Sequence, residues 1–428
     1  ARGDIFSIPA KSGVTYNLTN SSESNDRSAD WAPDGSAFAY ISDKDGEFNI
    51  WLRETKSGKE RKLTDIKGYI FGFEWSPDSK KILWSEKRNT LNIMDVASGK
   101  SSVIEESAMG PVNEYNWSPD SRYITYSLPS KTVDYIVIYD TKEGKKHIIT
   151  DEWYDCGSPN FSKDGKHLLF VSARTFNPSY GQTEFNHIYT RMNKIYILPL
   201  TKDAPVPFAL KNDTVSFAVN KTEGAKQDPS SKDLASGKQE VVYDYENISS
   251  RLVEVPLEAG FYRNVHMIGN TLYYDGGMTT SMYDIDSRKE SDLKAQIVFG
   301  PGYKKALAIA GGVMQIIDIP KAPVTISNPI SMSGVKMLVD YHKEWKQIYD
   351  ETWRQMRDYC YASNMHGVDW DKVYRRYAEL VPFVNHRSDL TYILGEMIGE
   401  LNVGHAYSQN GEHPEPVRVV TGLLGAEF

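Results

Sequence analysis

The first two hundred residues alternate between short apolar runs and polar turns, the pattern expected of β-strands. One motif divides this pattern, at residues 31–35 (WAPDG), 75–79 (WSPDS), 117–121 (WSPDS) and, in weaker form, 161–165 (FSKDG). The copies begin 44, 42 and 44 residues apart. In the three stronger copies, proline presets φ for a turn and the following aspartate can bond nearby backbone donors. A period of about 40–45 residues holding four strands is typical of a β-propeller blade.

Each motif is followed by an apolar strand, a turn and a second strand, as at 38–41 and 48–53. Two less regular blades are expected near 262–286 and 304–327. These repeats resemble the blades of TolB-type propellers, and we expect a seven-bladed ring. The aromatic residues of the motifs are interpreted as packing residues rather than as a ligand cage.

Two further features interrupt the repeats. Segments 4–8 and 15–19 look like the outer strands of a blade whose inner pair is absent, so either the last blade closes the ring with them or the chain begins within the propeller. Segment 212–239 is polar and carries few large apolar residues, which predicts an insertion at the surface.

After residue 329 the apolar period changes from 2 to about 3.6, which predicts helices. Asp369 is the expected N-cap of a second helix, and a third is expected to begin near Ser388 and stop at Gly404. Residues 405–408 are predicted to start a strand. One stripe of the first helix consists of Leu338, Tyr341, Trp345, Ile348, Thr352, Met356 and Tyr359.

Composition narrows the function classes. The 428 residues carry 49 Lys and Arg against 57 Asp and Glu, a net charge of −8, which gives no broad attraction to nucleic acid or anionic membrane. No apolar run approaches the roughly 20 residues of a membrane helix. Cys156 and Cys360 form neither a disulfide framework nor a zinc motif, and we expect no metal or cofactor. Residues 43–46 (DKDG) loosely resemble a calcium loop, but a hairpin turn is the better interpretation.

His405 is the residue that could carry chemistry. It follows an apolar helix at a predicted helix-to-strand junction, where a histidine can face a cleft and act as a general base. On residue type alone, a structural or surface histidine is the more frequent case. The chain contains no G-x-S-x-G, Walker, H-E-x-x-H or G-x-G-x-x-G motif.

The helical region carries a more specific resemblance. Residues 340–359, 364–371 and 394–407 resemble the first core region of the tricorn proteases, which are S41-type serine peptidases. Segment 244–251 also resembles this family, and 422–426 looks like the start of its PDZ-like domain. The resemblance implies that the chain is part of a longer protein.

The domains implied by this resemblance are a propeller at 1–327, a helical first core subdomain at 328–413 and the beginning of a PDZ-like domain at 414–428. The fold expected is therefore mainly β with an α-helical C-terminal part.

The resemblance also implies a mechanism. It maps the catalytic histidine of the family onto His405 and places the nucleophilic serine and its acidic partner beyond Phe428. Hydrolysis would proceed by serine acyl transfer, with the propeller as a filter or channel for peptide substrates, and this chain alone would be inactive. Gly404 stands where the archaeal pattern has a serine, so the partner that orients His405 is left open.

Other implications and alternatives remain. The family resemblance suggests a cytoplasmic protein, with a periplasmic or secreted form as the alternative, and homo-oligomers occur in the family. The chain could instead be a TolB-like propeller that binds protein partners without catalysis. A prolyl-oligopeptidase-type enzyme would also pair a propeller with a serine hydrolase, but the helices after residue 330 do not resemble an α/β-hydrolase.

Overall fold

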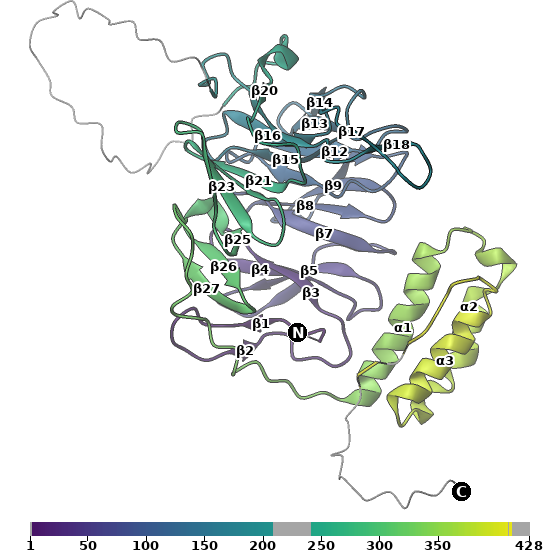
Figure 1. The fold of residues 1–428 in the computed structure, drawn as a ribbon. Helices are drawn as coiled ribbons and strands as arrows, with labels where there is room; N and C mark the ends of the chain where they lie inside the picture. Colours follow the sequence, from purple (N-terminus) through teal and green to yellow (C-terminus); the bar gives the residue numbers. More distant parts are fainter. Residues whose placement is uncertain (1, 209–240, 410, 413–428) are drawn as a thin grey trace, which may run out of the picture.

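The computed structural model describes residues 2–208, 241–409 and 411–412, which form a β-rich body followed by three helices (Figure 1). Five four-stranded antiparallel sheets and one three-stranded sheet follow one another along the chain. The first strands of successive sheets contact each other, as β3 contacts β7 and β11 contacts β15. This places the first strands innermost and makes each sheet one blade of a propeller.

The blades are numbered here in chain order. Blades 1 and 2 consist of β3 (Arg27–Trp31), β4 (Ala37–Ser42), β5 (Asn49–Glu54) and β6 (Glu60–Lys62), then β7 (Ile70–Trp75), β8 (Lys81–Glu86), β9 (Thr90–Asp95) and β10 (Ser101–Glu106). Blades 3 and 4 consist of β11 (Tyr115–Trp117), β12 (Tyr123–Leu128), β13 (Tyr135–Asp140) and β14 (Lys145–Ile148), then β15 (Cys156–Phe161), β16 (His167–Ser172), β19 (Lys194–Pro199) and β20 (Val253–Glu254). Blades 5 and 6 consist of β21 (Arg263–Ile268), β22 (Thr271–Asp275), β23 (Thr280–Asp284) and β24 (Lys289–Asp292), then β25 (Gln296–Phe299), β26 (Ala306–Ala310) and β27 (Val313–Ile317).

Shorter elements complete the β-rich body. A hairpin of β17 (Pro178–Tyr180) and β18 (His187–Tyr189) lies between β16 and β19, and β1 (Phe6–Ser7) pairs with β2 (Tyr16–Asn17). Two single turns of 3₁₀ helix, η1 (Ile248–Arg251) and η2 (Pro301–Tyr303), occur in the connections. The predicted insertion at 212–239 lies outside the described residues.

The expectation of seven blades is wrong for the part of the chain that the structure describes, which holds six. The N-terminal segments predicted as strands do pair, but only as the two-stranded β1–β2 sheet. This hairpin contacts blade 1, because the Arg53 guanidinium donates to the carbonyl of Leu18. The pairing follows from hydrogen-bonding capacity, since two short strands can satisfy each other without the inner pair of a full blade.

The repeated motif forms the turn between the first and second strands of its blade, as its proline and aspartate predict. Its fifth residue adopts positive φ in every copy, at Gly35, Ser79, Ser121 and Gly165. Serine tolerates this conformation less well than glycine, but here it makes a compensating contact. The N–H of Asp34 donates to Oγ of Ser79 at 3.0 Å, and the N–H of Asp78 donates to Oγ of Ser121 at 3.0 Å. The serines therefore join successive blades.

The motif aromatics are packing residues in three of the four copies. Trp75, Trp117 and Phe161 are buried, and Nε1 of Trp75 donates to the carbonyl of Asp30 in blade 1 at 3.3 Å. Trp31 is the exception, because it remains partly exposed against Phe38.

Three helices follow the propeller: α1 (Tyr341–Tyr359), α2 (Trp370–Ala378) and α3 (Arg387–Gly399), with 3₁₀ turns η3 (Met365–Gly367) and η4 (Val381–Phe383) between them. Asp369 caps α2 as predicted, since its carboxylate accepts the N–H of Lys372. The third helix begins one residue before the predicted start and is held by a capping box between His386 and Asp389. We call α1, α2 and α3 with η3 and η4 the helical module.

The apolar stripe predicted for the first helix is correct in its middle and wrong at its start. Trp345 is buried, but Leu338 lies before α1 and is largely exposed. Helix α1 begins instead where the Asp340 carboxylate accepts the N–H groups of His342 and Lys343. The core of the helical module is formed by Trp345, Tyr349, Trp370, Val373, Leu390, Leu394, Met397 and Leu401.

Candidate functional site

His405 lies on an exposed turn after the helical module. Helix α3 ends at Gly399, earlier than the predicted stop at Gly404, and residues 405–408 form a turn and irregular backbone rather than the predicted strand. His405 has φ of 62°, a left-handed conformation in which histidine is over-represented among non-glycine residues. The backbone therefore turns sharply at this position and presents the imidazole to solvent.

One side chain contacts the imidazole. Nδ1 of His405 lies 3.3 Å from the hydroxyl oxygen of Tyr407, and the two rings meet edge to face at 6.3 Å between centroids. An Nδ1–H that donates to this hydroxyl leaves Nε2 free to accept a proton. A Cβ added at Gly404 would meet no atom within 4 Å, so a larger residue would fit beside the histidine.

The segment that carries His405 is anchored on both sides. Its later part runs back along α3, where Oγ1 of Thr391 lies 3.5 Å from the carbonyl of Gln409. Arg2 contacts Glu412 at 2.9 Å and Glu344 of α1 at 2.6 Å. The N-terminal segment of the chain thus ties the histidine-bearing segment to α1.

Helix α1 in turn docks on the turn between β4 and β5. The Arg354 guanidinium donates to the Asp43 carboxylate and, at 2.9 Å, to the carbonyl of Gly46. Arg357 forms a two-pronged pair with Glu47 at 2.7 and 2.9 Å. Burial raises the pKa of the Asp43 carboxyl, while a hydrogen bond from Gln347 and the charge of Arg354 oppose that effect. The hairpin-turn interpretation of residues 43–46 is confirmed, because the N–H of Gly46 bonds back to the carbonyl of Asp43.

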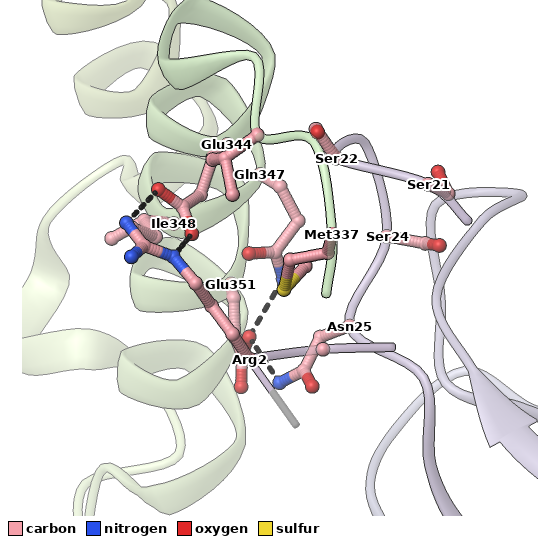
Figure 2. A pocket seen from close by; sticks show the side chains of 12 residues that line it. Arg2, Ser21, Ser22, Ser24, Asn25, Met337, Glu344, Gln347, Ile348 and Glu351 are labelled. Atoms are coloured by element: carbon pink, nitrogen blue, oxygen red, sulfur yellow. Dashed lines mark hydrogen bonds and ion pairs between the residues drawn. The ribbon is translucent and has the colours of Figure 1, made fainter. Parts of the chain in front are cut away.

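Figure 2 shows a small cavity at the same junction, with a volume of about 190 Å³. It lies between the N-terminal segment and α1. The Arg2–Glu344 pair borders it, and Glu351 accepts from Asn25 at 3.0 Å and from Gln347 at 2.7 Å (Figure 2). The lining is mainly polar, and several of its side chains bond to one another across the junction between the propeller and α1.

Burial shifts the pKa of Glu74 and His266 on first strands of their blades and of Tyr303 in η2. Burial raises the pKa of Glu74 on β7 to about 8, an effect partly offset by the N–H of Trp117 and strengthened by the nearby Asp30. Burial also raises the pKa of Tyr303 to about 12, and the charge of Glu74 adds to that shift. His266 on β21 has a pKa lowered to about 4 by burial.

The family comparisons divide the chain at the same place as the structure. The model described as the tricorn protease second beta propeller domain matches residues 1–312. The model described as the tricorn protease C1 domain matches residues 341–399, which contain all three helices. The chain belongs to the tricorn protease family.

Individual relatives agree with this assignment. Tricorn protease homolog 1 of Streptomyces coelicolor is 25% identical over 431 residues, which cover 93% of this chain and 35% of that protein. The tricorn protease of Thermoplasma acidophilum is 22% identical and covers 90% of this chain and 36% of its own length. A tricorn protease crystal structure superposes with a TM-score of 0.77 at 20% identity, covering 95% of this chain and 40% of that one. The chain therefore spans little more than a third of these relatives.

The described residues contain neither a membrane-spanning helix nor a metal-binding cluster of side chains. No helix there is long and apolar enough to cross a membrane. No group of three or more His, Cys, Asp or Glu side chains in those ranges could hold a metal ion. The predicted PDZ-like segment, 414–428, lies outside the described residues.

Sequence reasoning singled out His405, whose role stays a prediction, and did not single out Tyr407, Arg2 or the Asp43–Arg354 contact. The contacts of Arg2 and the Asp43–Arg354 contact are visible only in three dimensions. Tyr407 is close in sequence, and its spacing of two residues from His405 is the one signal that could have identified it. Arg2 and Asp43 lie more than 300 residues from their partners on α1, and no local pattern connects them.

Proposed function

We propose that this chain forms a propeller and the first core subdomain of a tricorn-type serine peptidase, in which His405 is the general base. The observation that carries this proposal is the position of His405, exposed on the turn that follows the helical module, with Nδ1 next to the Tyr407 hydroxyl. The domains proposed are 1–327 for the propeller, 328–413 for the core subdomain and 414–428 for the start of a PDZ-like domain.

The chemistry proposed is acyl transfer. In the tautomer proposed, Nδ1–H of His405 donates to the hydroxyl oxygen of Tyr407, 3.3 Å away, and Nε2 carries the lone pair that takes the proton of an attacking serine hydroxyl. The imidazolium then returns that proton to the leaving amine of the peptide. The serine and the acidic partner belong to regions outside this chain, so the chain by itself should not hydrolyse peptides.

The propeller is proposed to deliver extended peptides to this site. Its first strands carry polar groups such as Glu74 on β7 and His266 on β21, which could hydrogen-bond to the exposed backbone of an unfolded chain. Peptides of modest length are therefore the substrate class proposed.

The test uses the complete protein that contains this chain. His405→Ala should abolish hydrolysis of a fluorogenic peptide and labelling by a fluorophosphonate, a reagent that reacts with activated serines. Circular dichroism and thermal melting should be unchanged, because His405 is exposed. Retained turnover would remove His405 from the mechanism.

His342 offers a matched control. It is an exposed histidine on α1 that contacts Trp345 by its ring edge. His342→Ala should keep both hydrolysis and labelling near the level of the unmodified enzyme. Equal losses in the two variants would point to a general effect of removing a surface histidine.

A further inference from the structure

Blade 4 carries an insertion that its fold does not require. The connection between the second and third strands has six residues or fewer in blades 1, 2, 3 and 5, but 21 residues (173–193) in blade 4. The extra residues form the β17–β18 hairpin, which projects from the propeller (Figure 1). Long insertions with their own secondary structure in compact domains are usually functional.

The hairpin exposes large apolar side chains. Phe176 is 75% exposed, and Tyr180, Phe185, Ile188 and Tyr189 are also exposed. Pairs of these rings contact each other, with 5.8 Å between the centroids of Phe176 and Tyr189, yet none is covered by the blade. Clustered exposed aromatics on a soluble domain mark a binding surface.

More exposed apolar side chains lie on the same face of the propeller. In four-stranded blades, the connection from the second to the third strand and the one from the fourth strand to the next blade reach the same face. Such connections carry Trp153, which is 81% exposed, and the exposed residues Tyr154, Phe261 and Met278. Arg174 at the base of the hairpin stacks over Tyr154 at 5.0 Å and so links the hairpin to its neighbours.

The opposite face is different. Among its described connections, Val206 and Val242 are the exposed large apolar residues. The aromatic face is also the one on which the helical module docks, because the β4–β5 turn that holds Arg354 belongs to it. Figure 1 shows the hairpin and the helices projecting from the same side of the propeller.

We propose that the β17–β18 hairpin, with Trp153 and Tyr154, captures extended apolar peptides on the propeller face that carries the helical module. The inference rests on the proposed peptidase function and names the substrate segments that the propeller would select. The hairpin and the β4–β5 turn that holds α1 belong to the same face of the propeller, so a captured peptide would lie on the face that carries the helical module.

An extended peptide fits this surface better than a second copy of the chain. The β17–β18 sheet has two strands, so in the described structure each strand has an outer edge with unpaired backbone groups. An added strand would bond to such an edge, and its apolar side chains would contact the exposed rings. A stable dimer needs a broad continuous patch, whereas these residues are spread over a narrow hairpin and separate loops.

The experiment measures fluorescence anisotropy of a fluorescein-labelled, unstructured 15-residue peptide rich in Leu, Val and Phe, titrated with this chain. Two further probes are the same peptide with Ser and Gly replacing the apolar residues, and the apolar peptide N-methylated at alternate positions. We expect at least tenfold weaker binding of both, because one lacks apolar contacts and the other lacks backbone donors. Equal affinity for all three, or no binding of the apolar peptide, would overturn the proposal.

Variants locate the binding surface. Phe185→Ser with Tyr189→Ser, and separately Trp153→Ser, should each weaken binding of the apolar peptide at least fivefold. Val103→Ser removes an exposed apolar side chain from the outer strand β10 and should leave binding unchanged. A further variant replaces residues 175–191 with Gly-Ser-Gly, a short turn like those that join the second and third strands of other blades. It should melt at the same temperature as the parent and lose peptide binding, which would show that the loss does not come from misfolding.

Two outcomes separate this proposal from its rivals. A concentration-dependent dimer in sedimentation velocity that the hairpin variants abolish, without effect on peptide affinity, would make a second copy the occupant and overturn the proposal. Binding is measured without hydrolysis, so failure of the His405 test leaves this result intact, and loss of binding here leaves the role of His405 intact.

Discussion

The guanidinium of Arg354 on α1 is buried against the carboxylate of Asp43 in the β4–β5 turn, 311 residues away along the chain. The same turn offers the carbonyl of Gly46 to Arg354 and the carboxylate of Glu47 to Arg357. Arg354 and Arg357 lie one turn apart on the same face of α1, and together they bond to Asp43, Gly46 and Glu47 of blade 1. This contact positions the helical module, and with it His405, relative to the propeller.

Breaking that pair should loosen the docking of the helix. Asp43→Ala leaves the Arg354 charge buried without its partner, a loss of about 3–5 kcal/mol for pairs of this kind. We expect faster hydrogen–deuterium exchange of the α1 amides and a lower melting temperature. Lys343→Ala, which removes an exposed pair with Glu23, is the control and should change stability by less than about 1 kcal/mol. Equal effects of the two variants would show that Asp43 does not hold the helix.

Tyr407→Phe tests the partner of the imidazole. It removes the hydroxyl next to Nδ1 of His405 and leaves the ring contact. A hydrogen bond of this kind contributes about 0.5–1.5 kcal/mol. In the complete enzyme we therefore expect kcat to fall about threefold to tenfold with KM unchanged. An unaltered kcat would mean that another group orients the histidine.

Gly404→Ser asks whether glycine is required beside His405. A Cβ there meets no atom within 4 Å, and Gly404 is not among the residues with positive φ. The free energy of unfolding should stay within about 0.5 kcal/mol of the parent value. Peptide hydrolysis by the complete enzyme should be retained. Gly46→Ala is the contrast, since its φ of 101° should make the substitution cost about 1 kcal/mol. A destabilised Gly404→Ser would show strain at this turn.

Glu74→Gln tests the protonation of the Glu74 carboxyl on the first strand of blade 2. Burial raises the pKa of Glu74 in the folded protein to about 8, so the folded state binds this proton more tightly than the unfolded state does. Stability contributed by the protonated carboxyl is present below the ordinary pKa near 4.5 and is lost as the pH rises toward 8. Glutamine removes this loss, so the variant should gain stability over the parent as pH rises from 5 to 8, by at least about 1 kcal/mol at pH 8.

Thermal melts at pH 5, 6, 7 and 8 measure this difference. Glu106→Gln, at a position on the outer strand β10, is the control and should show no such trend. A constant difference between Glu74→Gln and the parent across this range would mean that Glu74 titrates as an exposed carboxylate does.

Local patterns predicted much of the fold. The motif copies predicted the turns of blades 1 to 4, because the aspartate of every copy, and the proline of the first three, act within the turn that contains them. Asp369 predicted the start of α2 for the same reason, since a cap bonds to amides two or three residues away. The strand predicted at 405–408 failed, because its apolar residues have no neighbouring strand to pair with in the described structure and His405 takes a left-handed turn.

The sequence by itself determined the blade repeat and the change from strands to helices, because each depends on contacts between residues close in the chain. The tertiary structure decided the number of blades, the docking of α1 by Asp43 and Arg354, and the gathering of aromatic side chains on one face. Those depend on pairs separated by tens to hundreds of residues, and their proximity is set by how sheets and helices pack rather than by any periodicity.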